Sequence, residues 1–395
     1  MTDIDSGIPS VPGEASLISY RDDFMRLSAT RTDSQEIIVS RGVLSPHNRV
    51  LSDLLEGRRS LFVVTPSVDR FYGDALRQCI DSGLFNRDSK VVSLNSTEAS
   101  KDLDAVGDLC NQFKHFGLGR NAPVVAMGGG VCLDISGLSA ALYRRGVPNI
   151  KVPTTLIGLV DAGIGTKNAV NHRGHKSMLG TFSTPLASVL DSTFLATLPA
   201  RHLRNGYAEM LKMAVIADHA LFKILREHGR ELIQGKFQGS HGLTDEVVMR
   251  SVGSMLQELS LNLYERSDYR RKVDFGHTFS PYIEAASMHS ILHGEAVAID
   301  IALSTQLAWN LGLLNIADRD AILESLKAVS LPCLWEGIDV GGMYSSLRSI
   351  RQHRDGSLHL VVPDGIGSCV FIEDEDFDPR LLAACVDQLS KSDRR

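Results

Sequence analysis

The sequence predicts two domains, an N-terminal α/β domain of the nucleotide-binding type followed by a mainly helical one. Two patterns indicate this fold class. Between residues 36 and 191, short apolar runs alternate with amphipathic segments, which is typical of parallel βαβ units. After about residue 200 the apolar period lengthens to roughly 3.6 residues, which indicates helices. A chain of 395 residues also exceeds what one ordinary core accommodates.

The first domain is expected to span residues 34–198. Residues 1–33 are rich in Ser, Pro and Asp and weakly periodic, so we expect a loose arm there. Helical patterns are centred on residues 70–82 and 100–116. Runs of strand type lie at residues 36–42, 59–67, 89–95, 122–130, 147–153 and 185–191.

The second domain is expected to span residues 199–395 and to be built mainly from helices. A hairpin is expected within residues 357–375, followed by a closing helix at 378–390. The long helical patterns lie at residues 207–229, 244–266, 294–312 and 318–330.

Composition and charge exclude several classes of partner. The net charge of −6 leaves no basic excess to bind a nucleic-acid backbone or an anionic membrane surface. The six cysteines are scattered without a CxxC motif, which fits reduced thiols in a cytosol. The acidic N-terminus does not resemble a signal peptide, and no uncharged apolar run reaches membrane-spanning length. We therefore expect a cytoplasmic protein that acts on a small molecule, without a nucleic-acid or membrane partner.

A glycine-rich turn joins a strand to a helix in "VVAMGGGVCLDISG". Gly128, Gly129 and Gly130 would let backbone N–H groups approach a pyrophosphate. The turn is not the GxGxxG fingerprint, and a tight turn without a ligand is the alternative. Asp134, one turn into the helix, would hold a sugar or ribose hydroxyl in the same crevice, or would simply favour the helix dipole.

Two lysines follow on a Gly/Asn-rich loop in "VDAGIGTKNAVNHRGHKSMLG". These are Lys167 and Lys176, with Asp161 just upstream. Lysines on a loop are often only solvated. Because the protein is acidic overall, lysines gathered beside a phosphate-binding crevice favour a phosphorylated small molecule.

Three side chains are candidates for a metal site. Glu209 and Lys212 lie three residues apart on a helix and share one face, as a surface ion pair also would. His277 in "DFGHTFSP" and His293 flank a helix at 280–292, where His293 could also act as a cap. Glu209, His277 and His293 would form the His₂Glu set that leaves a divalent metal one open position. Their spacing matches no short zinc motif, but the set would make the helical domain the metal-binding one.

Six motifs, taken in order, resemble the dehydroquinate synthase superfamily of sugar phosphate cyclases. They are "MGGGVCLD", "VPTTLIGLVDAGIGTK", "GHKSMLG", "NGYAEMLK", "DFGHTFSP" and "LHGEAVAIDIA", and the resemblance covers most of residues 35–375. The most similar branch is the sedoheptulose 7-phosphate cyclases, particularly those that make 2-epi-5-epi-valiolone, where "FGHTFSP" replaces the "FGHTFGH" of dehydroquinate synthases. The resemblance implies cyclisation of sedoheptulose 7-phosphate to 2-epi-5-epi-valiolone with phosphate release. It also implies one NAD, one Zn or Co ion and a homodimer.

The resemblance assigns residues by position. The metal ligands would be Glu209, His277 and His293. The residues that contact NAD would be Glu98, Lys101, Gly128, Gly129, Gly130, Thr154, Thr155, Phe194 and Thr197. The residues that line the substrate and the nicotinamide would be Asp134, Asp161, Lys167, Lys176, Asn205, Lys212 and Arg270.

In this family NAD is used and regenerated within each turnover. Oxidation of a substrate hydroxyl acidifies a neighbouring C–H, phosphate leaves, the hydride returns, and an intramolecular aldol step closes the ring. The substrate's own phosphate is held to take the proton. The lysines and Arg270 would bind an anion whose charge changes, so we expect them to affect turnover more than binding.

Several positions depart from the dehydroquinate synthase pattern. Those enzymes bind a substrate carboxylate through a lysine on the helix before "FGHT" and through an Asn and a His near the metal. Here the helix lacks that lysine, and Asp274 and Pro281 occupy the other two positions. The added negative charge of Asp274 would repel a carboxylate on the substrate, and the loss of the lysine and the histidine would remove its hydrogen-bond donors. This site would instead suit a substrate with a neutral hydroxymethyl group. Ser177 replaces a family Asn, and His353 stands near a family phosphate-binding lysine, unless it is a solvated loop residue.

Other readings remain open on the sequence alone. The same substrate yields 2-epi-valiolone or desmethyl-4-deoxygadusol in related cyclases, and 3-dehydroquinate synthase is a further alternative. Metal-dependent polyol dehydrogenases share the glycine turn and the metal histidines but need no phosphate cluster. The combination of Lys167, Lys176, Lys212 and Arg270 favours a cyclase over them. A non-catalytic paralogue is disfavoured because the metal and lysine positions are intact.

Overall fold

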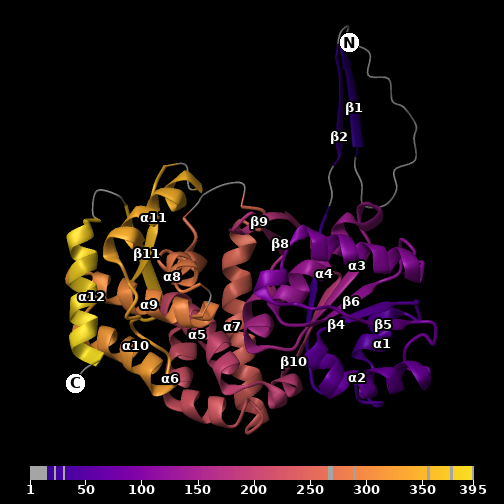
Figure 1. The fold of residues 1–395 in the computed structure, drawn as a ribbon, viewed down its shortest axis with the longest axis horizontal. Helices are drawn as coiled ribbons and strands as arrows, with labels where there is room; N and C mark the ends of the chain where they lie inside the picture. The colour runs from indigo at the N-terminus through magenta and orange to yellow at the C-terminus, as the bar shows by residue number, and fades with distance from the viewer. Residues whose placement is uncertain are drawn as a thin grey trace.

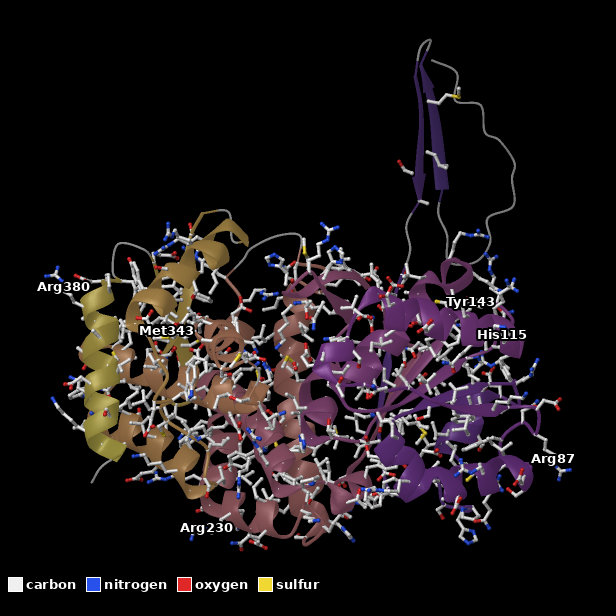
Figure 2. All side chains as sticks on the ribbon, viewed as in Figure 1. Arg87, His115, Tyr143, Arg230, Met343 and Arg380 are labelled. Atoms are coloured by element: carbon white, nitrogen blue, oxygen red, sulfur yellow. The ribbon has the colours of Figure 1, made fainter. Side chains whose placement is uncertain are left out.

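A computed structural model shows two lobes side by side, with a β-hairpin projecting from the N-terminal lobe (Figure 1). Side chains fill both lobes, and those of Arg87, Arg230 and Arg380 point outward from the surface (Figure 2). The structure describes residues 16–21, 24–29, 32–265, 270–288, 290–353, 356–373 and 377–393.

The N-terminal lobe is built on a six-stranded sheet in which every neighbouring pair of strands is parallel. The strand order is β3-β10-β7-β6-β4-β5. All six strands lie within the runs that the sequence predicts, which confirms the α/β fold class. The strands are β3 (Glu36–Ser40), β4 (Leu61–Val64), β5 (Lys90–Ser93), β6 (Val124–Gly128), β7 (Asn149–Pro153) and β10 (Ala187–Asp191).

Helices pack on both faces of this sheet and bury two hydrophobic clusters. Local signals fix where they begin. The Thr65 side chain accepts a hydrogen bond from the Val68 N–H at the start of α2, and the Asp102 side chain caps α3 in the same way. The helices are α1 (Val50–Leu55), α2 (Pro66–Asp81), α3 (Leu103–Phe116) and α4 (Gly130–Leu142), with short turns η1 (Glu98–Ser100), η2 (Tyr143–Arg145), η3 (Gly158–Ala162) and η4 (Ser192–Thr197).

The lysine segment is a β-hairpin, so the expectation of a loop was wrong. Strands β8 (Lys167–His172) and β9 (His175–Phe182) pair antiparallel around a tight turn at Arg173 and Gly174. Both turn residues have positive φ, 48° and 81°, as a two-residue hairpin turn requires. Gly174 therefore serves the turn, and Gly180 allows the close approach of the two strands, because a Cβ there would overlap the main chain of Asn168.

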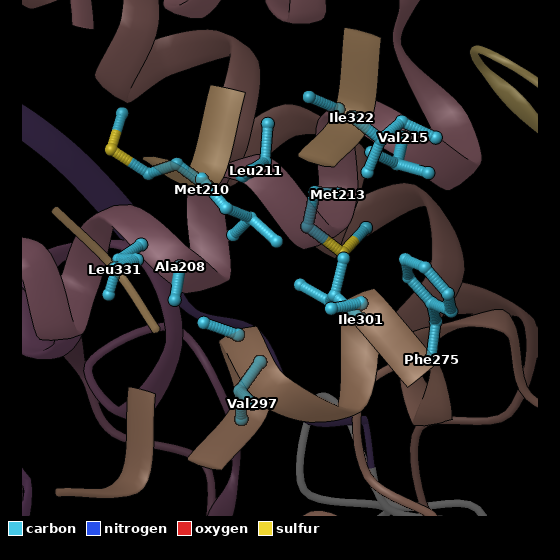
Figure 3. Packing of buried hydrophobic residues seen from close by; sticks show 14 of the residues in the cluster. Ala208, Met210, Leu211, Met213, Val215, Phe275, Val297, Ile301, Ile322 and Leu331 are labelled. Carbon is cyan, nitrogen blue, oxygen red and sulfur yellow. The ribbon is translucent and has the colours of Figure 1, made fainter. Parts of the chain in front are cut away.

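The C-terminal lobe is helical and is organised around α5 (Ala200–Ala217) and α9 (His293–Asn310). Met213 of α5 lies beside Ile301 of α9 and Phe275 (Figure 3), in a hydrophobic cluster that also contains Met210 and Val297. The remaining elements are α6 (His219–Gln234), α7 (His241–Leu261), η5 (Lys272–Asp274), α8 (Ser280–Ala286), α10 (Ile316–Ala328), α11 (Val340–His353), the predicted hairpin β11 (Leu360–Gly365) and β12 (Ser368–Ile372), and α12 (Pro379–Asp393).

Two further predictions concern the ends of the domains. Part of the expected loose arm is an ordered hairpin, β1 (Ser16–Arg21) paired antiparallel with β2 (Phe24–Ala29). The predicted boundary after residue 198 falls between η4 and α5, and it stays a prediction.

Among the helices that the structure describes, none combines the length and the apolar character needed to cross a bilayer.

Candidate functional site

A cavity of about 770 Å³ lies between the two lobes. Its walls come from α4, from the segment after β7, from the β8–β9 hairpin, and from α5, α7 and the segment before α8. The sequence predicted a cleft at this place. Eight of the predicted site residues line it: Asp134, Asp161, Lys167, Ser177, Lys212, Arg270, Asp274 and His277.

Helix α5 carries Glu209 and Lys212 on one face. The Lys212 Nζ lies 2.7 Å from Glu209 Oε2, and both side chains are almost fully buried. The alternative of a surface ion pair is therefore wrong. Burial opposes the charged form of Lys212, but Glu209 and Asp161 outweigh this effect and raise its pKa. The pair brings a cation and an anion together at the wall of the cavity.

Two histidines converge on the Glu209 carboxylate. Its Oε1 lies 3.6 Å from His277 Nε2 and 3.3 Å from His293 Nε2. Candidate ligand atoms of the three residues all lie within 4.8 Å of one another. Both Glu209 oxygens are buried, and neither receives a hydrogen bond of regular geometry from the described residues. A buried carboxylate with unsatisfied oxygens beside two imidazole nitrogens is the donor set that zinc takes in catalytic sites, so these residues fit a divalent metal.

The two histidines have different hydrogen-bond partners at Nδ1 and different pKa values. His277 Nδ1 lies 3.1 Å from the Phe275 carbonyl oxygen, and burial together with Lys212 lowers its pKa to about 4. It is therefore neutral, with Nδ1–H donating to the carbonyl and Nε2 directed at Glu209. Burial also opposes the charge on His293, but the nearby carboxylates of Glu209 and Glu284 raise its pKa to about 9. Both rings turn Nε2 toward the same carboxylate.

His293 is the first residue of α9 and is not its cap. Leu292 occupies the N-cap position, and the Glu295 carboxylate accepts a hydrogen bond from the Leu292 N–H at 2.9 Å. Asn205 of α5 accepts a hydrogen bond from the Gly294 N–H through Oδ1. A Cβ at Gly294 would overlap the Asn205 main chain, so only glycine allows this approach of the two helices. Asn205 thus supports the backbone beside His293.

The segment that carries His277 is fixed by a buried carboxylate. Asp300 Oδ2 accepts hydrogen bonds from the Phe279 N–H and, at 2.9 Å, from the Ser280 N–H. Phe279 occupies the N-cap position of α8, and Pro281 is the second helical residue. Pro281 still fits, since an N–H in the first helical turn has no intrahelical acceptor.

We expect Asp300→Ala to lower the free energy of unfolding by about 2–6 kcal/mol, because two buried N–H groups lose their acceptor at about 1–3 kcal/mol each. Asp300→Asn keeps an acceptor oxygen and should cost about 1 kcal/mol. Urea denaturation followed by circular dichroism measures both. An alanine variant as stable as the asparagine variant would contradict this role.

The glycine turn forms the N-terminus of α4. Gly129 is the N-cap, and no described side chain caps this helix. A Cβ on Gly129 would lie 3.1 Å from Thr155 Cγ2, and one on Gly130 would lie 3.3 Å from Ala162 Cβ. The glycines therefore allow the turn to lie close to the segment after β7. The uncapped N–H groups fit the predicted binding of a pyrophosphate.

Lys101 and Asp134 form an ion pair beside this turn. Their Nζ and Oδ2 atoms are 2.5 Å apart, and both side chains are largely buried. Asp134 lies beyond the first turn of α4, so the alternative of a simple dipole contact is wrong. Burial raises its pKa, against the opposing effect of Lys101. Glu98 Oε1 accepts a hydrogen bond from Asn171 Nδ2 at 2.8 Å, which ties η1 to the β8–β9 hairpin.

The other residues predicted to contact NAD have local roles. Thr154 is buried at the end of β7, and Thr155 Oγ1 accepts a hydrogen bond from the Gly158 N–H at 3.1 Å. The Phe194 ring packs edge-on against Tyr72 in the core, with ring centroids 4.9 Å apart. Thr197 Oγ1 lies 3.1 Å from the Tyr72 hydroxyl. Their contact with a cofactor stays a prediction.

The β8–β9 hairpin holds both lysines in ion pairs, so they are not simply solvated. Lys167 pairs with Glu265, and Lys176 Nζ lies 2.5 Å from Glu284 Oε2. Although half of the Lys167 side chain is exposed, the cavity walls and then Arg271 lower its pKa to about 8. Lys176 is not among the residues that line the cavity, and its partner Glu284 belongs to α8.

Of the four residues predicted to determine which substrate binds, two line the cavity and one does not, and the side chain of the fourth lies outside the described residues. Asp274 lines the cavity, but its carboxylate is paired with Arg271, so its negative charge is partly offset. Ser177 also lines the cavity, and its N–H donates to Asn171 Oδ1 at 2.8 Å. Pro281 is exposed on α8 and does not line the cavity. His353 ends α11, and its side chain lies outside the described residues.

Arg270 lies at the rim of the cavity, where its Nη2 is 3.2 Å from Glu373 Oε1. Its guanidinium is half exposed. A cation at the rim of the cavity is placed to meet an anionic substrate as it enters. Arg270 is thus brought to the site as predicted, although from a different wall than Lys167.

Four residues of the site were missed by the sequence reasoning: Lys151, Arg271, Glu284 and Asp300. Lys151 is fully buried in β7 and donates to the carbonyl oxygens of Ala162 and Gly165, at 3.2 and 2.9 Å. Burial lowers its pKa to about 8. Charged residues inside apolar runs, such as "NIKVP" and "AVAIDIA", were the signal that was available.

The sequence matches two family models that meet within α5. One is described as 3-dehydroquinate synthase N-terminal and covers residues 91–205. The other is described as 3-dehydroquinate synthase C-terminal and covers residues 206–352. Together they span more than half of the chain, including the glycine turn, the lysines and all three candidate metal ligands.

Curated relatives and a solved structure show which members of this family the chain resembles. A 2-epi-5-epi-valiolone synthase from Streptomyces albus is 42% identical over 372 residues, which cover 91% of this chain and 89% of the relative. A 3-dehydroquinate synthase from Acidithiobacillus ferrooxidans is 32% identical over 320 residues, with 78% and 83% covered. The solved 2-epi-5-epi-valiolone synthase ValA from Streptomyces hygroscopicus subsp. jinggangensis 5008, with NAD⁺ and Zn²⁺ bound, is 40% identical with a TM-score of 0.88, covering 93% of this chain and 99% of that one.

Proposed function

This chain belongs to the 3-dehydroquinate synthase family, and from that premise we propose that it cyclises sedoheptulose 7-phosphate to 2-epi-5-epi-valiolone with release of inorganic phosphate. The observation that carries the proposal is the cavity between the lobes. It combines a His₂Glu donor set at one wall with lysines and an arginine at the others. The higher identity to 2-epi-5-epi-valiolone synthases than to a 3-dehydroquinate synthase supports the choice of substrate.

The proposed cofactors are NAD and one divalent metal, Zn or Co. Glu209, His277 and His293 would hold the metal, and the turn at Gly128–Gly130 would receive the pyrophosphate of NAD. When bound, the metal supplies Lewis acidity toward substrate hydroxyls, and NAD supplies a hydride acceptor that is restored in each turnover. A structure of a relative that contains both NAD⁺ and Zn²⁺ supports this pair.

The charged residues of the cavity bind and orient the anionic substrate. Lys167, Lys212 and Arg270 present cations from three different walls, which matches a phosphate whose charge grows as its bond to carbon breaks. Asp161 is buried beside Lys212, and burial followed by the nearby Glu209 raises its pKa. Its carboxyl group is therefore suited to hold a proton next to the reacting carbons.

The lack of a lysine on the α7 wall of the cavity supports a ketoheptose phosphate as substrate, although Lys272 lies 3.0 Å from Glu258 and offsets part of its charge. The wall formed by α7 contributes Met255, Glu258 and Leu259 to the cavity and no cation. Asp274 faces the same space, although Arg271 offsets part of its charge. A second carboxylate on the substrate would therefore meet Glu258 and Asp274, which disfavours the substrate of 3-dehydroquinate synthase.

A polyol dehydrogenase would share the metal and NAD sites but would release NADH. The cations at Lys167, Lys212 and Arg270 favour a phosphorylated substrate over a neutral polyol. The geometry of ring closure and the final redox step distinguish 2-epi-5-epi-valiolone from 2-epi-valiolone and desmethyl-4-deoxygadusol. The curated relatives that are 42% and 43% identical to this chain are 2-epi-5-epi-valiolone synthases, which supports 2-epi-5-epi-valiolone as the product.

Purified protein incubated with sedoheptulose 7-phosphate, catalytic NAD and Zn²⁺ or Co²⁺ should release one phosphate per substrate and form 2-epi-5-epi-valiolone, identified by NMR. NADH should not accumulate at 340 nm, because the hydride returns to the product. Phosphate release from 3-deoxy-arabino-heptulosonate 7-phosphate instead would contradict the substrate. Net NADH formation with a polyol would contradict a cyclase.

We also propose that the protein acts in the cytoplasm as a homodimer. None of the six cysteines forms a disulfide, and four of them are buried, which fits a reducing compartment. The homodimer rests on the resemblance of the sequence to the family. Light scattering coupled to size exclusion would report twice the mass of the 43.1 kDa chain if it is correct.

A further inference from the structure

We propose that Glu284 is a positioning residue that holds two side chains at once: the candidate metal ligand His293 and Lys176, which the sequence predicts to bind the substrate's anionic group although it does not itself line the cavity. The proposal rests on the proposed metal site, and it concerns a residue to which the sequence reasoning gave no role. Glu284 lies on α8, between the segment of His277 and the start of α9. Its side chain is only 7% exposed, yet each of its two oxygens has a charged or polar partner.

The first oxygen orients His293. Glu284 Oε1 lies 2.9 Å from His293 Nδ1, on the side of the ring opposite Glu209. A carboxylate that accepts a hydrogen bond from Nδ1–H fixes the plane of the imidazole ring and leaves Nε2 as the nitrogen that a metal would take. His277 is held by a neutral carbonyl oxygen at Phe275. The two ligands therefore differ, because only His293 depends on a charged partner.

The second oxygen holds Lys176. Glu284 Oε2 lies 2.5 Å from Lys176 Nζ, which reaches it from β9 in the other lobe. A lysine side chain has many rotamers, and the ion pair with a buried carboxylate restricts them. The helix that carries Glu284 is itself pinned, since Asp300 accepts hydrogen bonds from the N–H groups of Phe279 and Ser280. Glu284 is thus a fixed anion between a metal ligand and a cation.

Sharing one carboxylate couples the two sites. A substitution at Glu284 should weaken metal binding through His293 and anion binding through Lys176 together, whereas a substitution at Lys176 should weaken only the second. Glutamine separates the contact with His293 from the contact with Lys176. Its carbonyl oxygen still accepts a hydrogen bond from His293 Nδ1, but its NH₂ group faces the Lys176 ammonium, and two donors cannot form a hydrogen bond. Alanine removes both contacts.

The experiment compares Glu284→Ala, Glu284→Gln and Lys176→Met in the full-length chain. Zn²⁺ affinity is measured by competition with a chromophoric chelator, the Co²⁺ absorption spectrum reports the ligand geometry, and calorimetry gives the affinity for inorganic phosphate. Glu284→Ala should weaken Zn²⁺ binding by about 10- to 100-fold and shift the Co²⁺ bands. Glu284→Gln should keep Zn²⁺ affinity within about threefold of the wild type but weaken phosphate binding as much as Lys176→Met does.

Glu246→Ala and Glu246→Gln are the matched controls, because Glu246 is an exposed helix residue that pairs only with Arg250 among the contacts described for it. They should leave every readout unchanged. Zn²⁺ and phosphate affinities of Glu284→Ala within twofold of the wild type would refute the proposal. If Glu284→Ala does not fold, the Glu284→Gln variant provides the test. A Glu284→Gln protein that binds phosphate as tightly as the wild type would refute the shared role of Glu284.

The two proposals can fail separately. A wild-type protein that binds no Zn²⁺ and releases no phosphate from sedoheptulose 7-phosphate refutes the proposed function. A wild-type protein that does both, together with Glu284 variants that behave like it, refutes only the role of Glu284.

Discussion

Replacing His277 with alanine should remove bound metal and activity together. His277 supplies one of three candidate ligand atoms. Burial and Lys212 favour its neutral form, and the Phe275 carbonyl oxygen orients its ring. Loss of a direct ligand should weaken metal binding by more than the roughly 100-fold that loss of a supporting residue can cause. Metal content after dialysis and phosphate release from sedoheptulose 7-phosphate measure the two effects.

The matched control is His115→Ala, an exposed histidine on α3 that should retain metal and activity. The folded state should survive in both variants, because His277 contributes a partly exposed ring rather than core volume. Full activity in a His277→Ala protein that has been depleted of metal would show that His277 is not a ligand needed for turnover.

Replacing Lys212 with methionine should have the second-largest effect. The buried ammonium is the partner of Glu209 and lies near Asp161, so its removal leaves two carboxylates in one buried site. Breaking a buried pair in this way costs about 3–5 kcal/mol of folding free energy. Since Lys212 also lines the cavity, kcat should fall by about 10²- to 10³-fold, as expected when one group that stabilises developing charge is lost.

Urea denaturation and steady-state kinetics separate the two parts of this prediction. Lys223→Met, on the exposed face of α6, is the control and should change neither quantity. A Lys212→Met protein that is destabilised but turns over substrate at the wild-type rate would give Lys212 a purely structural role. Unchanged stability would show that Glu209 does not depend on this cation.

Much of the fold could be predicted because its signals are local. The six parallel strands are short apolar runs bounded by turns, and the long helices keep one period over many residues. The candidate metal ligands were also found, since Glu209, His277 and His293 lie in motifs that can be recognised in order. The structure brings these three together from α5, from the segment before α8 and from the start of α9.

The parts that could not be predicted depend on contacts between distant segments. The β8–β9 hairpin has the composition of a loop, and its pairing is specified by a two-residue turn with positive φ. Arg271 partly offsets the charge of Asp274, a pairing that changes the reading of Asp274 as a free anion. Glu284 and Asp300 look like ordinary helix residues in the sequence. Their roles become visible only when α8 and α9 are placed against their partners.

The position of β10 in the sheet has a consequence for how the N-terminal lobe is assembled on the ribosome. β10 is the last strand of the sheet in the sequence, yet it pairs with both β3 and β7. β3, the first strand of that sheet, has β10 as its only neighbour in the described sheet order. During synthesis β3 must therefore wait unpaired until residues 187–191 emerge, and the lobe closes late through contacts between its two ends.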